Sequence, residues 1–257
     1  MELITFLGTA GARVMVANQI TASGGIWLNL NDTEILVDPG PGCIVQATKR
    51  KLRASNLQAI LLSHKHLDHS GDINVMIEAM TDGGFRKRGI VFAPVDALED
   101  DPVILRYLRS FPQEIVVLAA GKSYEVGDIS FETPLRHQHG VETYGFVFKT
   151  PRHTFSYIPD THYLDELVRC YRGDLLIINV VRLEPGGPYD HLSLPDAQKI
   201  IAGIKPKVAI LTHFGMTMWR AKPWELAERL SQETGVRVIA ARDGMRFDLA
   251  QLDAATA

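Results

Sequence analysis

Four side chains that can bind a metal ion lie within one six-residue segment, residues 64–69. His64, His66 and His69 supply imidazole nitrogens, and Asp68 supplies a carboxylate. In an extended segment, side chains two positions apart point to the same side, so His64 and His66 face one point. Asp68 and His69 stand at the start of the helix expected next and can turn back toward that point. Imidazole and carboxylate without thiolate suit Zn²⁺, Mn²⁺ or Fe²⁺, so the segment predicts a metal site.

Residues of the same chemical types follow other apolar runs that are far apart in the sequence. Ligand-binding residues in mixed α/β folds collect beyond the carboxyl ends of strands, where the loops leave a crevice. We therefore expect these residues to converge on the edge of the fold that carries the segment 64–69. They are Asp38, His139, Asp160 and His213.

The number of these groups predicts two metal ions rather than one, because a single ion uses three or four ligands. Two divalent ions about 3.5 to 4 Å apart, bridged by a carboxylate and a hydroxide, are suited to hydrolysing esters and phosphodiesters. His137 lies two positions before His139. Strand geometry alone therefore leaves either of these two histidines as the ligand.

The elements that must position these groups are short strands alternating with amphipathic helices. Twelve apolar runs predict strands, at residues 3–7, 26–30, 34–37, 59–62, 90–92, 115–118, 129–133, 144–149, 154–158, 175–180, 208–211 and 236–240. Six amphipathic segments predict helices, near residues 44–54, 71–81, 101–110, 163–171, 195–203 and 223–233. These elements favour an α/β fold of two sheets with helices outside, not one doubly wound sheet.

The composition is that of a globular protein. The chain has 257 residues, of which 46% are hydrophobic and 22% are charged, and its net charge is -3. Such values exclude a disordered chain, a collagen-like chain and a simple coiled coil. A protein that binds long nucleic acid usually carries a basic excess, which this sequence lacks.

Several features lead us to expect a cytoplasmic protein without a membrane partner. No apolar run approaches the roughly 18 to 20 residues of a membrane span. Glu2 stands where a signal peptide needs a basic residue. The two cysteines, Cys43 and Cys170, form neither a Cys-x-x-Cys zinc pair nor a disulfide framework, which fits a reducing compartment.

With these motifs in place, the sequence resembles the metallo-β-lactamase superfamily over most of its length. The central superfamily motif, His-x-His-x-Asp-His, is matched by residues 64–69. The third motif is a histidine followed six residues later by a Gly-aromatic pair, and His139 rather than His137 has this relation to Gly145-Phe146. The remaining motifs match Val37-Asp38-Pro39-Gly40, Pro159-Asp160-Thr161, His213 and Asp243-Gly244-Met245. The resemblance implies a four-layer αβ/βα sandwich of two mixed β-sheets flanked by helices, which we expect as a single domain over residues 1–257.

The resemblance also implies a role for each residue of the site. The first metal ion is expected on His64, His66 and His139, and the second on Asp68, His69 and His213. Asp160 is expected to bridge the two ions, and Asp38 to orient ligands, as metal-binding histidines usually require. We expect zinc, with manganese or iron as alternatives. The catalytic set is expected to be His191, Asp68 and Asp38.

His191 points to one branch of the superfamily. It precedes His213 by 22 residues, in the sequence Asp190-His191-Leu192-Ser193. RNase Z-type and PhnP-like phosphodiesterases carry a histidine at this offset, which protonates the leaving oxygen. Such a proton donor accelerates departure of a poor alkoxide leaving group by roughly 10² to 10⁴. Only 21 residues separate His139 from Asp160, so the tRNA-gripping arm of RNase Z is expected to be absent, and the cysteines of the PhnP-like structural zinc site are missing.

The sequence thus predicts a dinuclear phosphodiesterase that acts on a small or cyclic phosphodiester through a metal-bridging hydroxide. One alternative is a lactone or carboxylic-ester hydrolase, because Tyr163 follows Asp160 by three residues, as in lactonases of this superfamily. Another is an RNase Z-like nuclease without the arm, acting through a partner subunit. We expect a small-molecule substrate rather than nucleic acid, and a homodimer is the candidate assembly.

Overall fold

The computed structural model describes residues 2–99, 101–187 and 190–253, and their strands form two seven-stranded sheets. The first sheet contains β1 (Glu2–Phe6), β2 (Ile26–Leu30), β3 (Thr33–Val37), β4 (Ala59–Leu61), β5 (Ile90–Ala93), β6 (Glu114–Val117) and β14 (Arg246–Asp248). The second sheet contains β7 (Lys122–Val126), β8 (Ile129–Thr133), β9 (Phe146–Lys149), β10 (Thr154–Ile158), β11 (Leu175–Asn179), β12 (Val208–Thr212) and β13 (Arg237–Ala240).

Each sheet is mixed, with an antiparallel part and a parallel part. In the first sheet, the order is β14-β1-β2-β3-β4-β5-β6, and the pairs from β3 to β6 are parallel. In the second sheet, the order is β13-β12-β11-β10-β9-β8-β7, and the pairs from β10 to β13 are parallel. The carboxyl ends of parallel neighbours lie at one edge of a sheet. The loops after β3 and β4, and those after β10, β11 and β12, are therefore grouped at the sheet edges.

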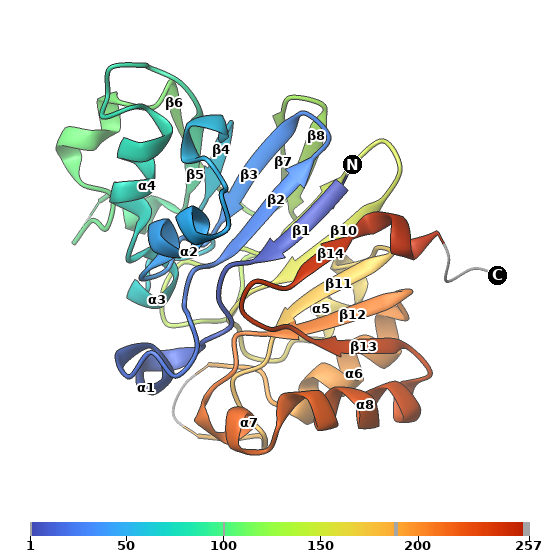
Figure 1. Ribbon diagram of the computed structural model, residues 1–257. Coiled ribbons are helices and arrows are strands. Elements are labelled where there is room, and N and C mark those ends of the chain that lie inside the picture. The colour runs from blue at the N-terminus through green and yellow to red at the C-terminus, as the bar shows by residue number, and fades with distance from the viewer. Residues whose placement is uncertain (1, 100, 188–189, 254–257) are drawn as a thin grey trace.

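Helices cover the outer face of each sheet. The helices of the described residues are α1 (Ala12–Ala17), α2 (Cys43–Lys49), α3 (Leu67–Ser70), α4 (Ile73–Met80), α5 (Asp165–Cys170), α6 (Leu194–Ile204), α7 (Met216–Arg220) and α8 (Pro223–Thr234). Of these, α2 and α4 pack on the first sheet, and α5, α6 and α8 pack on the second. Figure 1 shows α2 and α4 outside the first sheet and α6 and α8 outside the second. None of the helices within the described ranges is long and apolar enough to cross a membrane.

Three apolar clusters define the layers of the fold. The first lies between the two sheets, the second joins the second sheet to α5, α6 and α8, and the third joins the first sheet to α2 and α4. Helix, sheet, sheet and helix therefore stack in that order. This is the four-layer sandwich of two mixed sheets that the sequence predicts.

The structure also contains elements that hydrophobic periodicity does not reveal. Strand β7 is an edge strand with three of its five residues exposed, and β14 has only three residues. Helices α1, α3 and α7 have four to six residues each, which is about one helical turn. The connection between β9 and β10 is a single hairpin, as the short spacing from His139 to Asp160 predicts.

The helix expected over residues 101–110 is wrong. The structure has only a 3₁₀ turn there, η3 (Arg106–Ser110), preceded by the 3₁₀ turn η2 (Val95–Ala97). Side chains form hydrogen bonds with backbone groups that an α-helix would use for its own internal hydrogen bonds. Asn74 on α4 donates to the carbonyl of Val103 and accepts from the amide of Leu105, at 2.8 and 2.9 Å.

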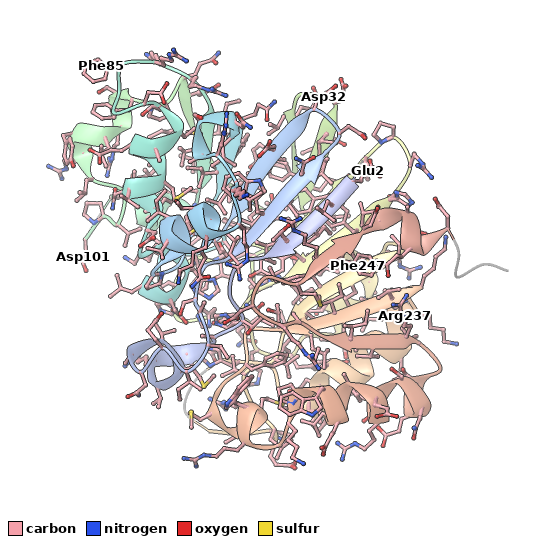
Figure 2. The ribbon with its side chains drawn as sticks, viewed as in Figure 1. Glu2, Asp32, Phe85, Asp101, Arg237 and Phe247 are labelled. Atoms are coloured by element: carbon pink, nitrogen blue, oxygen red, sulfur yellow. The ribbon has the colours of Figure 1, made fainter. Side chains whose placement is uncertain are left out.

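Segments from opposite ends of the chain pack together. Residue Ile4 of β1 lies opposite Phe247 of β14, and Figure 2 labels Phe247 and Glu2 on these neighbouring strands. The buried imidazole of His153 links the two segments, with Nδ1 2.8 Å from a Glu2 carboxylate oxygen and Nε2 3.1 Å from an Asp253 carboxylate oxygen.

We expect Phe131→Ala to lower the free energy of unfolding by roughly 3 to 5 kcal/mol. The ring is fully buried between the sheets, with the rings of Phe92 and Tyr124 at centroid distances of 5.0 and 5.1 Å. Phe85→Ala is the matched control, because that side chain is 93% exposed, and its effect should stay within about 0.5 kcal/mol. Guanidinium unfolding of both variants measures the difference, and equal losses would contradict the assignment of the core.

Candidate metal centre

The loops at the carboxyl ends of four strands bring most of the polar residues together. Asp38 follows β3, His64 and the segment to His69 follow β4, Asp160 follows β10, and His213 follows β12. Asp38 and His213 adopt left-handed backbone angles, with φ of 52° and 58°. Such angles are uncommon outside glycine, although Asp and His adopt them more readily than most residues. Each turns the chain sharply as it leaves its strand.

The first group of candidate ligands is His64, His66 and His139. One ring nitrogen of each lies within 4.8 Å of the others, and Nε2 of His139 is 3.0 Å from Nδ1 of His66. His64 is buried, while the other two rings are half-buried. His64 and His66 come from the first sheet and His139 from the second. The group therefore spans both halves of the sandwich.

The second group is Asp68, His69, Asp160 and His213, also with ligand atoms within 4.8 Å of one another. Nε2 of His213 lies 3.5 Å from a carboxylate oxygen of Asp68 and 3.5 Å from Oδ1 of Asp160. Nε2 of His69 lies 3.6 Å from Oδ2 of Asp160. This group also joins residues from both sheets.

Asp160 lies between the groups. Its Oδ2 is 3.2 Å from Nε2 of His191, and these two residues form a third group with His139. Because His139 also belongs to the first group and Asp160 to the second, this third group connects the other two. Asn179, the last residue of β11, donates from Nδ2 to Oδ1 of Asp160 at 2.9 Å and fixes the carboxylate.

Asp38 is buried behind the two groups and acts as a hydrogen-bond acceptor for several of their supports. Its Oδ1 accepts from the backbone amide of Ser63 at 2.7 Å. Its Oδ2 accepts from the Ser63 hydroxyl at 2.7 Å, from Nδ1 of His69 at 2.9 Å and from the Tyr157 hydroxyl at 3.0 Å. Gly25 allows this approach, since a Cβ there would lie 2.2 Å from the Asp38 carbonyl oxygen. Asp38 thus positions the ring nitrogens of candidate ligands and is not itself a member of either group.

These hydrogen bonds fix the tautomers of three histidines. The Ser63 hydroxyl gives its proton to Asp38, so Nδ1 of His64, at 3.0 Å, must donate to the Ser63 oxygen. Nδ1 of His69 donates to Asp38, and Nδ1 of His139 donates to the Asp190 carbonyl oxygen at 2.9 Å. With Nδ1 protonated, a neutral imidazole presents the lone pair of Nε2, which is the form that binds metals.

The geometry fits divalent metal ions. Nε2 of His64, His69 and His213 is buried and has no hydrogen-bond partner among the described residues, which is costly for a polar atom. Ligand atoms about 2.0 to 2.2 Å from a tetrahedral metal ion stand about 3.3 to 3.6 Å from one another. The 3.5 and 3.6 Å separations around Asp160 match that spacing.

Burial keeps the first group neutral. Burial lowers the pKa of His64 well below its usual range, and the neighbouring His69 lowers it further. Burial, together with the adjacent His139, lowers the pKa of His66 to about 4. Burial is also the main cause of the lowered pKa of His139. The lone pairs of these rings are therefore available at neutral pH.

Carboxylates have the opposite effect on the second group. Burial alone would lower the pKa of His69 and His213, but nearby negative charges outweigh it. Asp38 raises the pKa of His69 well above its usual range, and Asp160 raises that of His213 to about 9. Burial acts to raise the pKa of Asp160, yet the charge of His213 holds it well below the usual range. A metal ion entering this group must displace protons.

Two residues that the sequence leaves open lie outside the groups. His137 is buried, with Nε2 2.7 Å from the Tyr171 hydroxyl, and burial lowers its pKa to about 4. Its Nδ1 is 3.3 Å from the Asp160 carbonyl oxygen, so it supports the backbone of that loop. The Tyr163 hydroxyl donates to Asp165 on α5 at 3.0 Å.

Sequence reasoning misses three residues that support the site: Ser63, Tyr157 and Asn179. Ser63 and Asn179 are polar residues at the ends of otherwise apolar strands, which is the same signal that identifies Asp160 and His213. Tyr157 gives no such signal, because an aromatic residue in a buried strand is ordinary core.

Comparison with known proteins assigns the family. A family model described as "Beta-lactamase superfamily domain" matches residues 33–214, and the chain belongs to this superfamily. The matched region contains every residue of the groups described above. Together with the fold and the His/Asp groups, this makes the chain a metal hydrolase of the metallo-β-lactamase fold.

Two sequence relatives differ in how much they match. An uncharacterized protein of Methanocaldococcus jannaschii is 32% identical over 253 residues, which cover 96% of this chain and 94% of the relative. A ribonuclease Z of Methanopyrus kandleri is 25% identical over 155 residues, covering 58% of this chain and 51% of the relative. The ribonuclease is thus similar over about half its length.

Solved structures share the fold at low sequence identity. The metallo-β-lactamase fold protein YhfI of Bacillus subtilis has a TM-score of 0.81 at 20% identity, covering 96% of this chain and 98% of its own. Zn²⁺-bound PqqB of Methylobacterium extorquens has a TM-score of 0.74 at 14% identity, covering 96% and 100%. A diphosphatase from the PhnP family has a TM-score of 0.69 at 18% identity, covering 96% of each chain.

The metal-free protein should be most stable near pH 6.5. His66 has a lowered pKa of about 4 in the folded state, so its protonation on unfolding costs stability as the pH falls from about 6.5 to 4. His213 has a raised pKa of about 9, so its contribution is complete below about 6.5 and is lost as the pH rises through 9. Guanidinium midpoints of chelator-treated protein at pH 5, 6.5 and 9 test this. His213→Gln should flatten the alkaline side, and an unflattened decline would contradict the assignment.

Asp38→Asn should weaken metal binding by about 10- to 100-fold, which is the usual cost of losing such a supporting partner. The amide cannot accept hydrogen bonds from Ser63 and His69 as the carboxylate does. The ring of His64, which Ser63 contacts, and the ring of His69 therefore lose their fixed orientation. Zinc titration against a fluorescent chelator measures the change. Asp32→Asn, in the exposed turn between β2 and β3, is the matched control and should bind zinc normally. Equal affinity in both variants would show that Asp38 does not position the ligands.

Proposed function

We propose that this protein is a dinuclear, zinc-dependent phosphodiesterase that acts on a small or cyclic phosphodiester. His64, His66 and His139 would hold one ion, Asp68, His69 and His213 the other, and Asp160 would contact both. Bound divalent ions would supply neutralising charge for an anionic phosphate and would make water acidic enough to act as a nucleophile at neutral pH. Imidazole and carboxylate donors suit zinc, and Zn²⁺-bound PqqB shares the fold.

The residues around the ions have separate tasks in this proposal. Asp38 and Ser63 keep the Nε2 lone pairs of His64 and His69 directed inward. Asn179 holds the Asp160 carboxylate by one oxygen, which restricts its rotation. A site whose ligands are held in advance spends less binding energy on ordering them when the substrate enters.

The observation that favours a phosphodiester is the place of His191. Its Nε2 is 3.2 Å from Oδ2 of Asp160, and the side chain is 14% exposed at the edge of the groups. An imidazolium there could give its Nε2 proton to the departing alkoxide oxygen and accept a proton again from water. The 18% identical PhnP-family diphosphatase and the partial match to ribonuclease Z agree with this choice.

The rival functions have less support. A lactonase role for Tyr163 requires its hydroxyl at a substrate carbonyl, whereas that hydroxyl is bonded to Asp165. A role as a tRNA nuclease is disfavoured because there is no tRNA-gripping arm between β9 and β10. Only the turn from Lys149 to Thr154 separates these strands. Parallel assays on bis-p-nitrophenyl phosphate, p-nitrophenyl acetate and a homoserine lactone separate these functions. The highest kcat/KM on either carboxylic ester would refute the phosphodiesterase.

His191→Ala should keep its metal content but lose roughly two to four decades of rate on a diester with a basic alkoxide leaving group. On bis-p-nitrophenyl phosphate the loss should be much smaller, because p-nitrophenolate departs without a proton. Steady-state rates on both substrates, together with metal analysis of the variant, give the answer. Equal losses on the two substrates would remove the general-acid role, and loss of a metal ion would make His191 a ligand.

Fully loaded protein should contain two metal ions per chain. Asp160→Ala should lower the amount of bound metal more than the loss of any other single ligand. Asp160 adjoins both groups, so its removal should release both ions, whereas His66→Ala should reduce the affinity for one. Elemental analysis of wild type and both variants after zinc loading and gel filtration measures this. Full activity at one equivalent of zinc would contradict the dinuclear site.

A further inference from the structure

A second cavity lies near the metal centre, on the other side of the loop that carries His213. Its volume is ≈ 310 Å³, at the lower end of the roughly 300 to 1,000 Å³ typical of small-molecule sites. It opens between the start of α8 and the loop after β13. Its principal lining residues are Thr9, Phe214, Trp219, Trp224, Arg242 and Asp243.

One layer of backbone separates this cavity from the metal centre. Gly8 and Ala10 line the space beside the metal ligands, whereas Thr9 between them lines the second cavity. Likewise, His213 lines the space beside the metal ligands and Phe214 lines the second cavity. Ala10 and Phe214 are paired by a β-bridge. Successive residues of an extended chain point to opposite sides. The two spaces are therefore back to back rather than parts of one groove.

The walls of the cavity are aromatic. Trp219 on α7 and Trp224 on α8 meet edge to face, with ring centroids 6.0 Å apart and planes at 84°. Trp224 is 42% exposed, although a tryptophan usually buries most of its large apolar surface. Phe214 is buried and closes the inner end. Flat aromatic surfaces at this angle suit a planar ring, which can stack on one indole and meet the edge of another.

Of the two charged residues that line the cavity, Asp243 has hydrogen-bond partners for its carboxylate, and the guanidinium of Arg242 has none among the described residues. Both oxygens of Asp243 are engaged, Oδ1 by the Thr9 hydroxyl at 2.8 Å and Oδ2 by the amide of Ala22 at 2.7 Å. Arg242 is exposed, and no group in the described part of the chain forms a hydrogen bond or an ion pair with its guanidinium. A planar guanidinium binds carboxylate or phosphate oxygens in pairs. The cavity therefore offers a positive charge that suits an anion.

We propose that this cavity binds a free small molecule in which a planar aromatic ring carries a carboxylate or phosphate group. The ring would lie in the corner that Trp219 and Trp224 form, and the anionic group would pair with Arg242 at the opening. The site is separate from the metal centre, so its occupation does not require metal. Because Phe214 directly follows His213, a bound ring would also pack against the backbone of the loop that carries a candidate ligand.

Isothermal titration calorimetry with 1-naphthoate tests the proposal on both zinc-loaded and chelator-treated protein. We expect binding in both forms, and binding at least tenfold weaker in Arg242→Ala and in Trp224→Ala. Both side chains are exposed, so these variants should fold. Arg220→Ala is the matched control, because Arg220 is an exposed arginine on α7 that does not line the cavity, and it should bind 1-naphthoate normally.

1-Naphthylmethylamine, the cation of nearly the same shape, should bind at least tenfold more weakly than 1-naphthoate. Three results would overturn the proposal: no binding of 1-naphthoate, equal binding by Arg242→Ala and wild type, or stronger binding of the amine. Binding that disappears when zinc is removed would place the anion at the metal centre and would also refute the separate site. None of these results depends on whether the protein hydrolyses phosphodiesters.

Discussion

Imidazole nitrogens that are buried close together without hydrogen-bond partners are costly unless a cation binds among them, and the candidate site is built around this constraint. Three Nε2 atoms, of His64, His69 and His213, are buried without a hydrogen-bond partner in the described residues. Protein interiors rarely leave such atoms unpaired, because each costs about 1 to 3 kcal/mol. The surrounding hydrogen bonds to Asp38 and Ser63 keep the rings from turning away. The architecture therefore holds an arrangement that a bound cation would stabilise.

The two sheets share this arrangement. The first sheet contributes His64, His66, Asp68 and His69, and the second contributes His139, Asp160 and His213. Because each group draws on both sheets, bound metal would tie together two layers whose contact is mainly apolar. The pKa values of His69 and His213 in the second group are raised and that of His66 in the first is lowered, because the carboxylates outweigh burial only in the second group. One site thus combines a part ready for metal with a part that must first lose protons.

Much of this could be predicted from the sequence, because metal ligands at strand ends leave a local pattern of residue types. The metal-binding motif of residues 64–69 can be recognised from those six residues alone. The other ligands follow apolar runs that predict strands. The supporting residues are harder to predict. Ser63 and Tyr157 matter through a carboxylate 25 and 119 positions before them, and no local pattern encodes such partners. The helix predicted over residues 101–110 is wrong for a similar reason, because the side chain of Asn74 forms hydrogen bonds with backbone groups of that segment.

The pairing of β1 with β14 has a consequence for how the chain is made. Strand β1 leaves the ribosome before β14, so one of its edges stays open until residues 246–248 have been synthesised. An exposed strand edge can pair with other chains, so the nascent protein carries this hazard while the residues between the two strands are translated. Contacts of such long sequence separation also form slowly. The first sheet is therefore completed only after β14 has been synthesised and has paired with β1.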